Sequence, residues 1–255
     1  MLTELLGKGG KFCQPALEGK LRCPLIVRPN AEDVVSGTVM GVLQVLQARW
    51  WLPDLFNLAL GATRFDRQVF PRLIIDLWKN RPVFPRELLT WAEGSSQIDT
   101  SITWEWRPTL AYWEWKYTSP LSPHTSNSDP QGRYPNDQLI RNIRNGLLEA
   151  GWYDRGGLFL STPRDFVQLV VAPQRGESLV VKYRDPNKLL ASIPFAEKLK
   201  GLPRVPFVGE LSYRDIIDVL KRQRRFFSPP ERKLLDLACQ YLDYKIATLS
   251  GSANS

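Results

Sequence analysis

Residues 109–122 of the chain have the sequence TLAYWEWKYTSPLS, which places Glu114 and Lys116 one residue apart inside a run of aromatic side chains. Side chains along a β-strand alternate between the two faces of a sheet, so residues of one parity share a face. Residues 110–117 are therefore predicted to form a strand in which Tyr112, Glu114 and Lys116 share one face. The opposite face carries Ala111, Trp113, Trp115 and Tyr117. A carboxylate and an ammonium group on one face of so aromatic a strand are either a solvated pair or part of a site.

A second strand is predicted directly upstream, at residues 99–106, because apolar and polar residues alternate along it. Pro108 suits the second position of a turn that joins the two strands. If the strands pair as neighbours, Asp99 approaches Glu114 near one edge of the sheet. Two carboxylates that close repel each other unless a cation lies between them, and Mg²⁺ prefers carboxylate oxygens. The pattern indicates a metal site at Asp99 and Glu114, with Lys116 placed to hold a phosphate or to orient or deprotonate a metal-bound water.

Two helices are predicted to bring further polar groups to this region. The first spans residues 28–51 and carries Glu32 in its first turn, where it could supply a third carboxylate, although the helix dipole alone also favours an acid there. Another helix is predicted to begin near Asp137, after a long loop. Gln138 and Arg141 share one face of it, with groups suited to bind a water or a phosphate. For the other polar residues of this helix, Asn142 and Asn145, an ordinary solvated surface is preferred.

The other segments are assigned from periodicity and turn residues. Helices are expected at 53–62, 70–80, 85–92, 212–227 and 228–249, and strands at 157–163, 166–173 and, as a further candidate, 177–183. The last helix begins with a capping box from Ser228 to Glu231. The expected domain organisation is a core at 1–205, a helical extension packed on it at 206–249, and a disordered tail at 250–255.

The composition is that of a globular domain, with 255 residues, 43% hydrophobic and 24% charged. The net charge of +8 suggests a polyanionic partner. Three sparse cysteines indicate a reducing compartment and argue against a zinc site, and the single histidine, His124, argues against a Ser-His-Asp triad. No apolar run is long enough to span a bilayer, so a soluble, cytoplasmic protein without a membrane partner is expected.

The order of these motifs resembles the PD-(D/E)XK, or restriction-endonuclease-like, nuclease superfamily. The segments that carry the resemblance are IDTSI with Asp99, WEWKYTSPLS with Glu114 and Lys116, and NDQLIRNIRNG with Gln138 and Arg141. The likeness covers roughly residues 31–165, and Gln97 departs from the acid or proline that related sequences often carry there. It implies an α/β fold with a restriction-endonuclease-like core, in which helices flank a mixed central sheet, and with a helical C-terminal extension.

The resemblance also implies hydrolysis of phosphodiester bonds in nucleic acid, with DNA favoured over RNA and Mg²⁺ or Mn²⁺ as cofactor. The implied catalytic residues are Asp99, Glu114, Lys116, Glu32 and Gln138, of which Asp99 and Glu114 bind the metal. Glu32 matches the family's upstream acid by position, and Glu105, which has the parity of Asp99, is an alternative ligand. The expected phosphate contacts are Arg141, Lys221, Arg222, Arg224 and Arg225.

Several alternatives stay open. For the basic run 221–225, the alternative is a solvated helix end that the helix dipole favours. The tryptophans around the site either pack in the core or stack on splayed bases. The whole protein is either an active nuclease, an inactive nuclease-fold subunit for nucleic-acid binding or complex assembly, or an interaction protein with a structural ion pair. A homo-oligomer and an unidentified partner protein are also compatible with the sequence.

Overall fold

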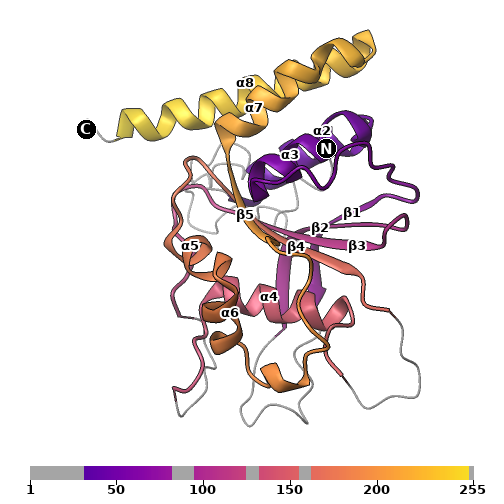
Figure 1. Cartoon of the computed structure of the whole chain (residues 1–255). Helices are drawn as coiled ribbons and strands as arrows, with labels where there is room; N and C mark the ends of the chain where they lie inside the picture. The colour runs from indigo at the N-terminus through magenta and orange to yellow at the C-terminus, as the bar shows by residue number, and fades with distance from the viewer. Residues whose placement is uncertain (1–31, 82–94, 125–131, 155–161, 253–255) are drawn as a thin grey trace, which may run out of the picture.

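The computed structural model describes residues 32–81, 95–124, 132–154 and 162–252 of the chain. The strands among these residues form one mixed sheet with the order β1-β2-β3-β4-β5 (Figure 1). The strands are β1 (Ile74–Arg81), β2 (Ser96–Trp104), β3 (Thr109–Trp115), β4 (Asp165–Ala172) and β5 (Val208–Ser212). The β1–β2 and β2–β3 pairs are antiparallel, whereas β3, β4 and β5 run parallel.

Helices cover both faces of the sheet, which confirms the predicted α/β architecture with a mixed sheet and a C-terminal helix. One face is covered by α2 (Glu32–Val45), α3 (Leu52–Leu60), α7 (Tyr213–Gln223) and α8 (Pro229–Ser252). The other face is covered by α4 (Gln138–Glu149), α5 (Ser178–Arg184) and α6 (Pro186–Ser192). Short 3-10 turns are η2 (Ala48–Trp50), η3 (Ala196–Lys198) and η4 (Arg224–Phe226). Helix α8 lies outermost, across α7 and α2 (Figure 1).

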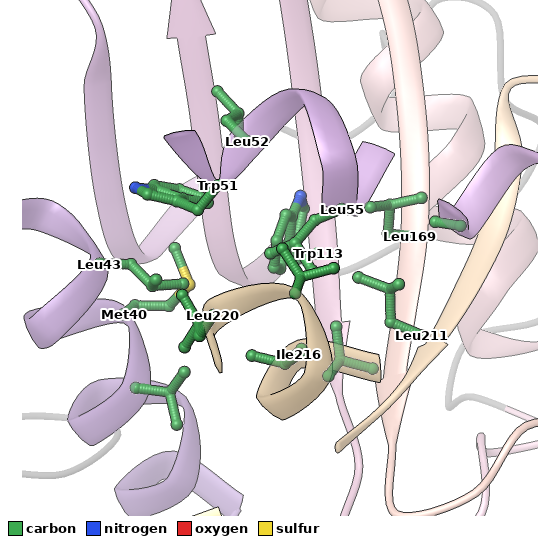
Figure 2. Packing of buried hydrophobic residues seen from close by; sticks show 14 of the residues in the cluster. Met40, Leu43, Trp51, Leu52, Leu55, Trp113, Leu169, Leu211, Ile216 and Leu220 are labelled. Carbon is green, nitrogen blue, oxygen red and sulfur yellow. The ribbon is translucent and has the colours of Figure 1, made fainter. Parts of the chain in front are cut away.

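Strand β3 lies in the middle of the sheet and is buried along its whole length. Trp113 points into the cluster under α3 and α7, where Leu55, Leu211 and Ile216 surround it (Figure 2). Tyr112, of the other parity, packs in the cluster under α4. The alternation predicted for this strand is therefore present. Burial of each large side chain contributes roughly 2–3 kcal/mol, so the aromatic positions hold the β3 backbone in place.

Two of the predicted elements are wrong in type. Residues 70–80, expected as a helix, contain the edge strand β1, which is stabilised by its ladder to β2, with partners 15 to 29 residues away. Residues 177–183, the candidate strand, contain helix α5. In α5 the buried residues are Val180 and Tyr183, three apart, while Val181 is exposed, so the true period is helical and not two.

The remaining expectations for secondary structure are met or fall outside the described residues. Helices α2, α3, α4, α7 and α8 and strand β4 lie where helices and a strand were predicted. One half of the predicted capping box is present, because Glu231 accepts from both the N–H and the hydroxyl of Ser228. The segment expected as a helical extension also contributes strand β5, and α8 is described as far as Ser252. The helix expected at 85–92 and most of the strand expected at 157–163 lie outside the described residues.

Within the described part of the chain, no helix is both long enough and apolar enough to cross a membrane.

Candidate functional site

The C-terminal end of β3 positions the two polar residues that interrupt its aromatic pattern. Lys116 directly follows the strand, and its backbone is held on both sides. Its N–H donates to the carbonyl of Val171 in β4 at 2.8 Å, and its carbonyl accepts from the hydroxyl of Tyr213 at 2.6 Å. Glu114 lies on the face of β3 that packs against α4, and its side chain is only 1% exposed. The rigid strand therefore fixes both side chains relative to each other.

Asp99 lies next to Glu114 where β2 and β3 begin to separate. The paired register runs as far as Thr100 and Trp113, so the next pair across the ladder is Asp99 and Glu114, which share a face. The carboxylate of Asp99 acts where a backbone carbonyl would accept in a regular ladder, because its Oδ2 accepts from the backbone N–H of Trp115 at 2.9 Å. On the other side of β2, Trp78 has a φ of 52°, a strained value for a bulky residue. Strain of this kind tends to gather at functional sites.

The carboxylate of Glu114 accepts hydrogen bonds from three side chains. Its Oε1 accepts from Gln138, and its Oε2 accepts from Asn142 at 2.9 Å. The ammonium of Lys116 lies 3.0 Å from Oε1. Three donors on one buried carboxylate restrict its orientation.

Glu32, at the first turn of α2, completes a group of acids around Lys116. Its Oε2 lies 3.5 Å from the Lys116 ammonium, and its Oε1 accepts from the backbone N–H of Tyr117 at 3.2 Å. Burial by itself would lower the pKa of Lys116. Glu114, Glu32 and Asp99 together outweigh that effect and raise the pKa above its usual value, so the side chain is an ammonium at neutral pH. The structure thus brings together Asp99, Glu114, Lys116, Glu32 and Gln138, the five residues that were expected to be catalytic.

Asn142 is a member of this group that the sequence interpretation missed, because its side chain was expected to be solvated. It is buried and donates to Glu114. Its spacing contained the signal, since residues four apart on a helix share a face and Asn142 follows Gln138 by four. Glu105 was considered as an alternative ligand, and its position argues against that role. It is exposed beyond the far end of β2 and pairs with Arg72 at 2.7 Å.

The basic residues expected to contact phosphates are mostly engaged in ion pairs of the folded chain. The pairs are Lys221 with Asp243 at 3.7 Å, Arg222 with Asp54 at 2.9 Å, and Arg224 with Asp236 at 2.7 Å. The guanidinium of Arg225 lies 4.8 Å from the centre of the Phe226 ring. Arg141 is placed differently, on α4 and one turn after Gln138, whose side chain donates to Glu114. Lys221, Arg222 and Arg224 thus link α7 and η4 to α3 and α8 through ion pairs of exposed side chains.

The tryptophans of β2 and β3 are packed in the core. Trp104, Trp113 and Trp115 are all buried, whereas Trp106, in the turn between the two strands, is 57% exposed. The buried rings are not available to stack on bases. Of these four tryptophans, only Trp106 is exposed enough to do so.

Asp99 and Glu114 fit a divalent cation by the chemistry of their donor atoms. Both are buried carboxylates on facing positions of neighbouring strands. Mg²⁺ is usually bound by one or two carboxylates together with waters and substrate phosphates, so two acids match its needs. Within the described residues, no group of three or more His, Cys, Asp or Glu side chains is arranged as a metal cage. A metal bound here would take its remaining ligands from water or substrate.

Comparison of the chain with protein-family models, with curated proteins and with solved structures found no match in any of the three. The residues of the chain itself therefore carry the functional interpretation.

Proposed function

We propose that this protein is a metal-dependent nuclease of the PD-(D/E)XK type that hydrolyses phosphodiester bonds of nucleic acid, with DNA favoured over RNA. The observation that supports this proposal is the excess of negative charge around Lys116. One ammonium group is surrounded by the carboxylates of Asp99, Glu114 and Glu32, which leaves a formal excess of two negative charges in a largely buried place. Such an excess is costly unless a cation joins the group.

Each residue has a defined part in this proposal. Asp99 and Glu114 would hold Mg²⁺ or Mn²⁺, which would supply Lewis acidity to the scissile phosphate and to the attacking water. Lys116 donates hydrogen bonds to the attacking water or to a non-bridging oxygen of the phosphate, where charge develops. Gln138 and Asn142 keep the Glu114 carboxylate in one orientation.

Glu32 and Arg141 act at the edges of the same site. The contact of Glu32 with the Lys116 ammonium, at 3.5 Å, limits where that ammonium can move. Arg141 offers a planar, permanently charged fork to a phosphate next to the scissile one. Small displacements of such groups cost large factors in rate, which is a reason to mount them on buried elements.

A nuclease-fold subunit without catalytic activity is the second candidate. The observation that favours it is the saturation of Glu114, whose two oxygens already meet Lys116, Gln138 and Asn142. A closed network of this kind can stabilise a fold with no metal bound. The protein would then act in nucleic-acid binding or complex assembly.

The test is a cleavage assay on supercoiled plasmid and on single-stranded DNA, with Mg²⁺, Mn²⁺ or EDTA. Glu114→Gln removes the charge of the candidate ligand. Glu105→Gln is the matched control, because it makes the same chemical change at an exposed position beyond the far end of β2. Wild type and Glu105→Gln should cut with either metal and stop with EDTA. Glu114→Gln should be slower by about 10²-fold or more, the scale of losing one electrostatic group.

Thermal melts establish that each variant is folded under the assay conditions. Equal cutting by wild type and a folded Glu114→Gln variant would place the activity elsewhere and contradict the proposal. Tight binding of DNA by a wild type that cuts under no metal condition would favour the inactive subunit.

A further inference from the structure

A small hollow lies at the end of the sheet where β3 and β4 begin, opposite to the acidic cluster that Asp99, Glu114 and Glu32 form around Lys116. We call it the Arg64 pocket. It has a volume of about 40 Å³, and its polar lining consists of Arg64, Gln68, Arg107, Thr109, Asp165 and Arg204. Thr109 and Glu114 are five residues apart on β3, so the pocket is about 17 Å from the acidic cluster at the usual rise per residue.

Arg64 is a buried guanidinium whose hydrogen-bonding groups are incompletely used. Its side chain is only 4% exposed. Nη1 donates to the backbone carbonyl of Arg204, but Nε and Nη2 have no hydrogen-bond partner. The nearest carboxylate oxygen, Oδ2 of Asp165, is 3.7 Å from Nη2, beyond hydrogen-bond distance. Leaving buried charged donors without acceptors is costly, so this site favours an added acceptor.

The charges around Arg64 also favour an anion. Three arginines and one aspartate line the pocket, which leaves a formal excess of two positive charges. Burial lowers the pKa of Arg64; Asp165 opposes this effect, and Arg204 adds to it, so the repulsion between the arginines is felt at the buried group. Asp165 also uses its Oδ1 to accept from the N–H of Phe166 at 3.0 Å. One carboxylate does not balance the arginines.

The shape of these donors indicates which anion fits. A guanidinium presents its N–H groups in a planar fork that matches two oxygens of a phosphate or carboxylate. Arg64 offers Nε and Nη2, the two neighbouring positions that form one side of such a fork. Arg107 and Arg204 are exposed long side chains, so they can turn towards further oxygens of the same group. Several arginines converging on one hollow suit a tetrahedral group with three or four oxygens better than a planar carboxylate.

We propose that the Arg64 pocket binds the oxyanion of a phosphate group, with Arg64 as its buried anchor and Arg204 and Arg107 closing over it. The phosphate is either free phosphate or a terminal monoester, or it is a diester of a nucleic-acid backbone. Trp106, exposed next to Arg107 in the turn between β2 and β3, could stack on a base of the second kind of ligand. This site does not depend on the nuclease proposed above, because it shares no residue with the acidic cluster.

The first arm of the test is calorimetry of the full-length chain with inorganic phosphate, at constant ionic strength. Arg204→Gln removes one charge from the pocket at an exposed position. The matched control is Arg67→Gln, which makes the same change in the same loop as Arg64 but outside the pocket lining. Wild type and Arg67→Gln should bind one phosphate per chain, and Arg204→Gln should bind about tenfold more weakly, as expected for the loss of one charged hydrogen bond. Arg64→Lys, which keeps the charge and loses the fork, should weaken binding as well.

The second arm uses a short oligonucleotide without terminal phosphate, with the same variants. Binding that weakens in Arg204→Gln but not in Arg67→Gln identifies a backbone diester, and a difference confined to inorganic phosphate identifies a free or terminal phosphate. If neither ligand binds the wild type, or if Arg67→Gln weakens both ligands as much as Arg204→Gln does, the proposal is wrong. The melting temperature of Arg204→Gln shows whether that variant is folded.

Discussion

Lys116 and Glu114 form an ion pair whose side chains are 10% and 1% exposed, and this exposure decides what their contact is worth. Taking two charges out of water is expensive, so a buried pair need not stabilise the fold relative to apolar side chains. Removing one partner, however, leaves the other charge buried without its counter-ion. The pair is therefore sensitive to single substitutions even where its net contribution is small.

We expect Lys116→Met to lower the free energy of unfolding by about 3 kcal/mol. The substitution leaves the Glu114 carboxylate buried without its counter-ion, while methionine keeps roughly the volume of the lysine side chain. Urea denaturation at pH 7 measures this loss. Glu114→Gln with Lys116→Met in one chain removes both charges and should cost clearly less than the sum of the two single variants. A strictly additive result would mean that the two side chains do not interact.

Cys239 provides a pH prediction that is separate from the site. Burial raises the pKa of its thiol to about 11, so only about one thiol in a thousand is ionised at pH 8. In a Cys13→Ser/Cys23→Ser variant, a thiol reagent at pH 8 should react with Cys239 slowly in water and fast in denaturant. Fast reaction in the folded state would contradict the buried position.

The sign of the effect on stability follows from the same pKa. The folded state keeps its thiol proton to a higher pH than the unfolded state, whose thiol has an ordinary pKa near 9. The contribution of Cys239 to stability is therefore complete below pH 9 and falls as the pH rises from about 9 towards 11.

At the scale of secondary-structure elements, helix α4 approaches β4 closely through Gly146. A Cβ atom at this position would lie 2.0 Å from the ring of Phe166, which is itself buried against Tyr112. Gly146 is thus needed for the distance between helix and sheet. That distance is what allows Gln138 and Asn142, on the same helix, to reach Glu114.

Gly146→Ala should destabilise the protein by about 1–3 kcal/mol through overpacking, although alanine favours helices by nearly 1 kcal/mol over glycine. Thermal or urea unfolding gives the value. In a Phe166→Leu background, where the ring is absent, the same substitution should cost much less. A wild-type protein that becomes more stable with Gly146→Ala would refute the tight contact.

Local patterns predicted the elements that carry their own signal. Strand β3 alternates over its whole length, and α4 and α8 begin with capping residues that are visible in the sequence. Strand β1 could not be identified in this way, because it is a half-exposed edge strand whose stability comes from a partner far along the chain. Helix α5 is only seven residues long, too short for its apolar residues to establish a period.

At the scale of the whole molecule, the acidic cluster joins α2, β2, β3 and α4, which are distant in the chain. The sequence predicted that Asp99, Glu114 and Lys116 lie close together, because they belong to two strands that were expected to pair as neighbours. The ion pairs of the basic run depend on how helices pack against one another, which no local pattern contains. The same holds for the Arg64 pocket, whose arginines come from separate loops.

Metal binding by the acidic cluster is the physical premise of the proposed nuclease, and calorimetric titration with Mn²⁺ tests it most directly. Asp99→Asn removes one ligand charge but keeps an oxygen for the Trp115 N–H. Asp76→Asn is the matched control, since Asp76 is a partly exposed residue of β1 that pairs with Lys79. We predict that wild type and Asp76→Asn bind one Mn²⁺ ion per chain and that Asp99→Asn binds at least about tenfold more weakly, as losing one charged ligand implies. Equal Mn²⁺ affinity in wild type and Asp99→Asn, or no binding by the wild type, would contradict the account.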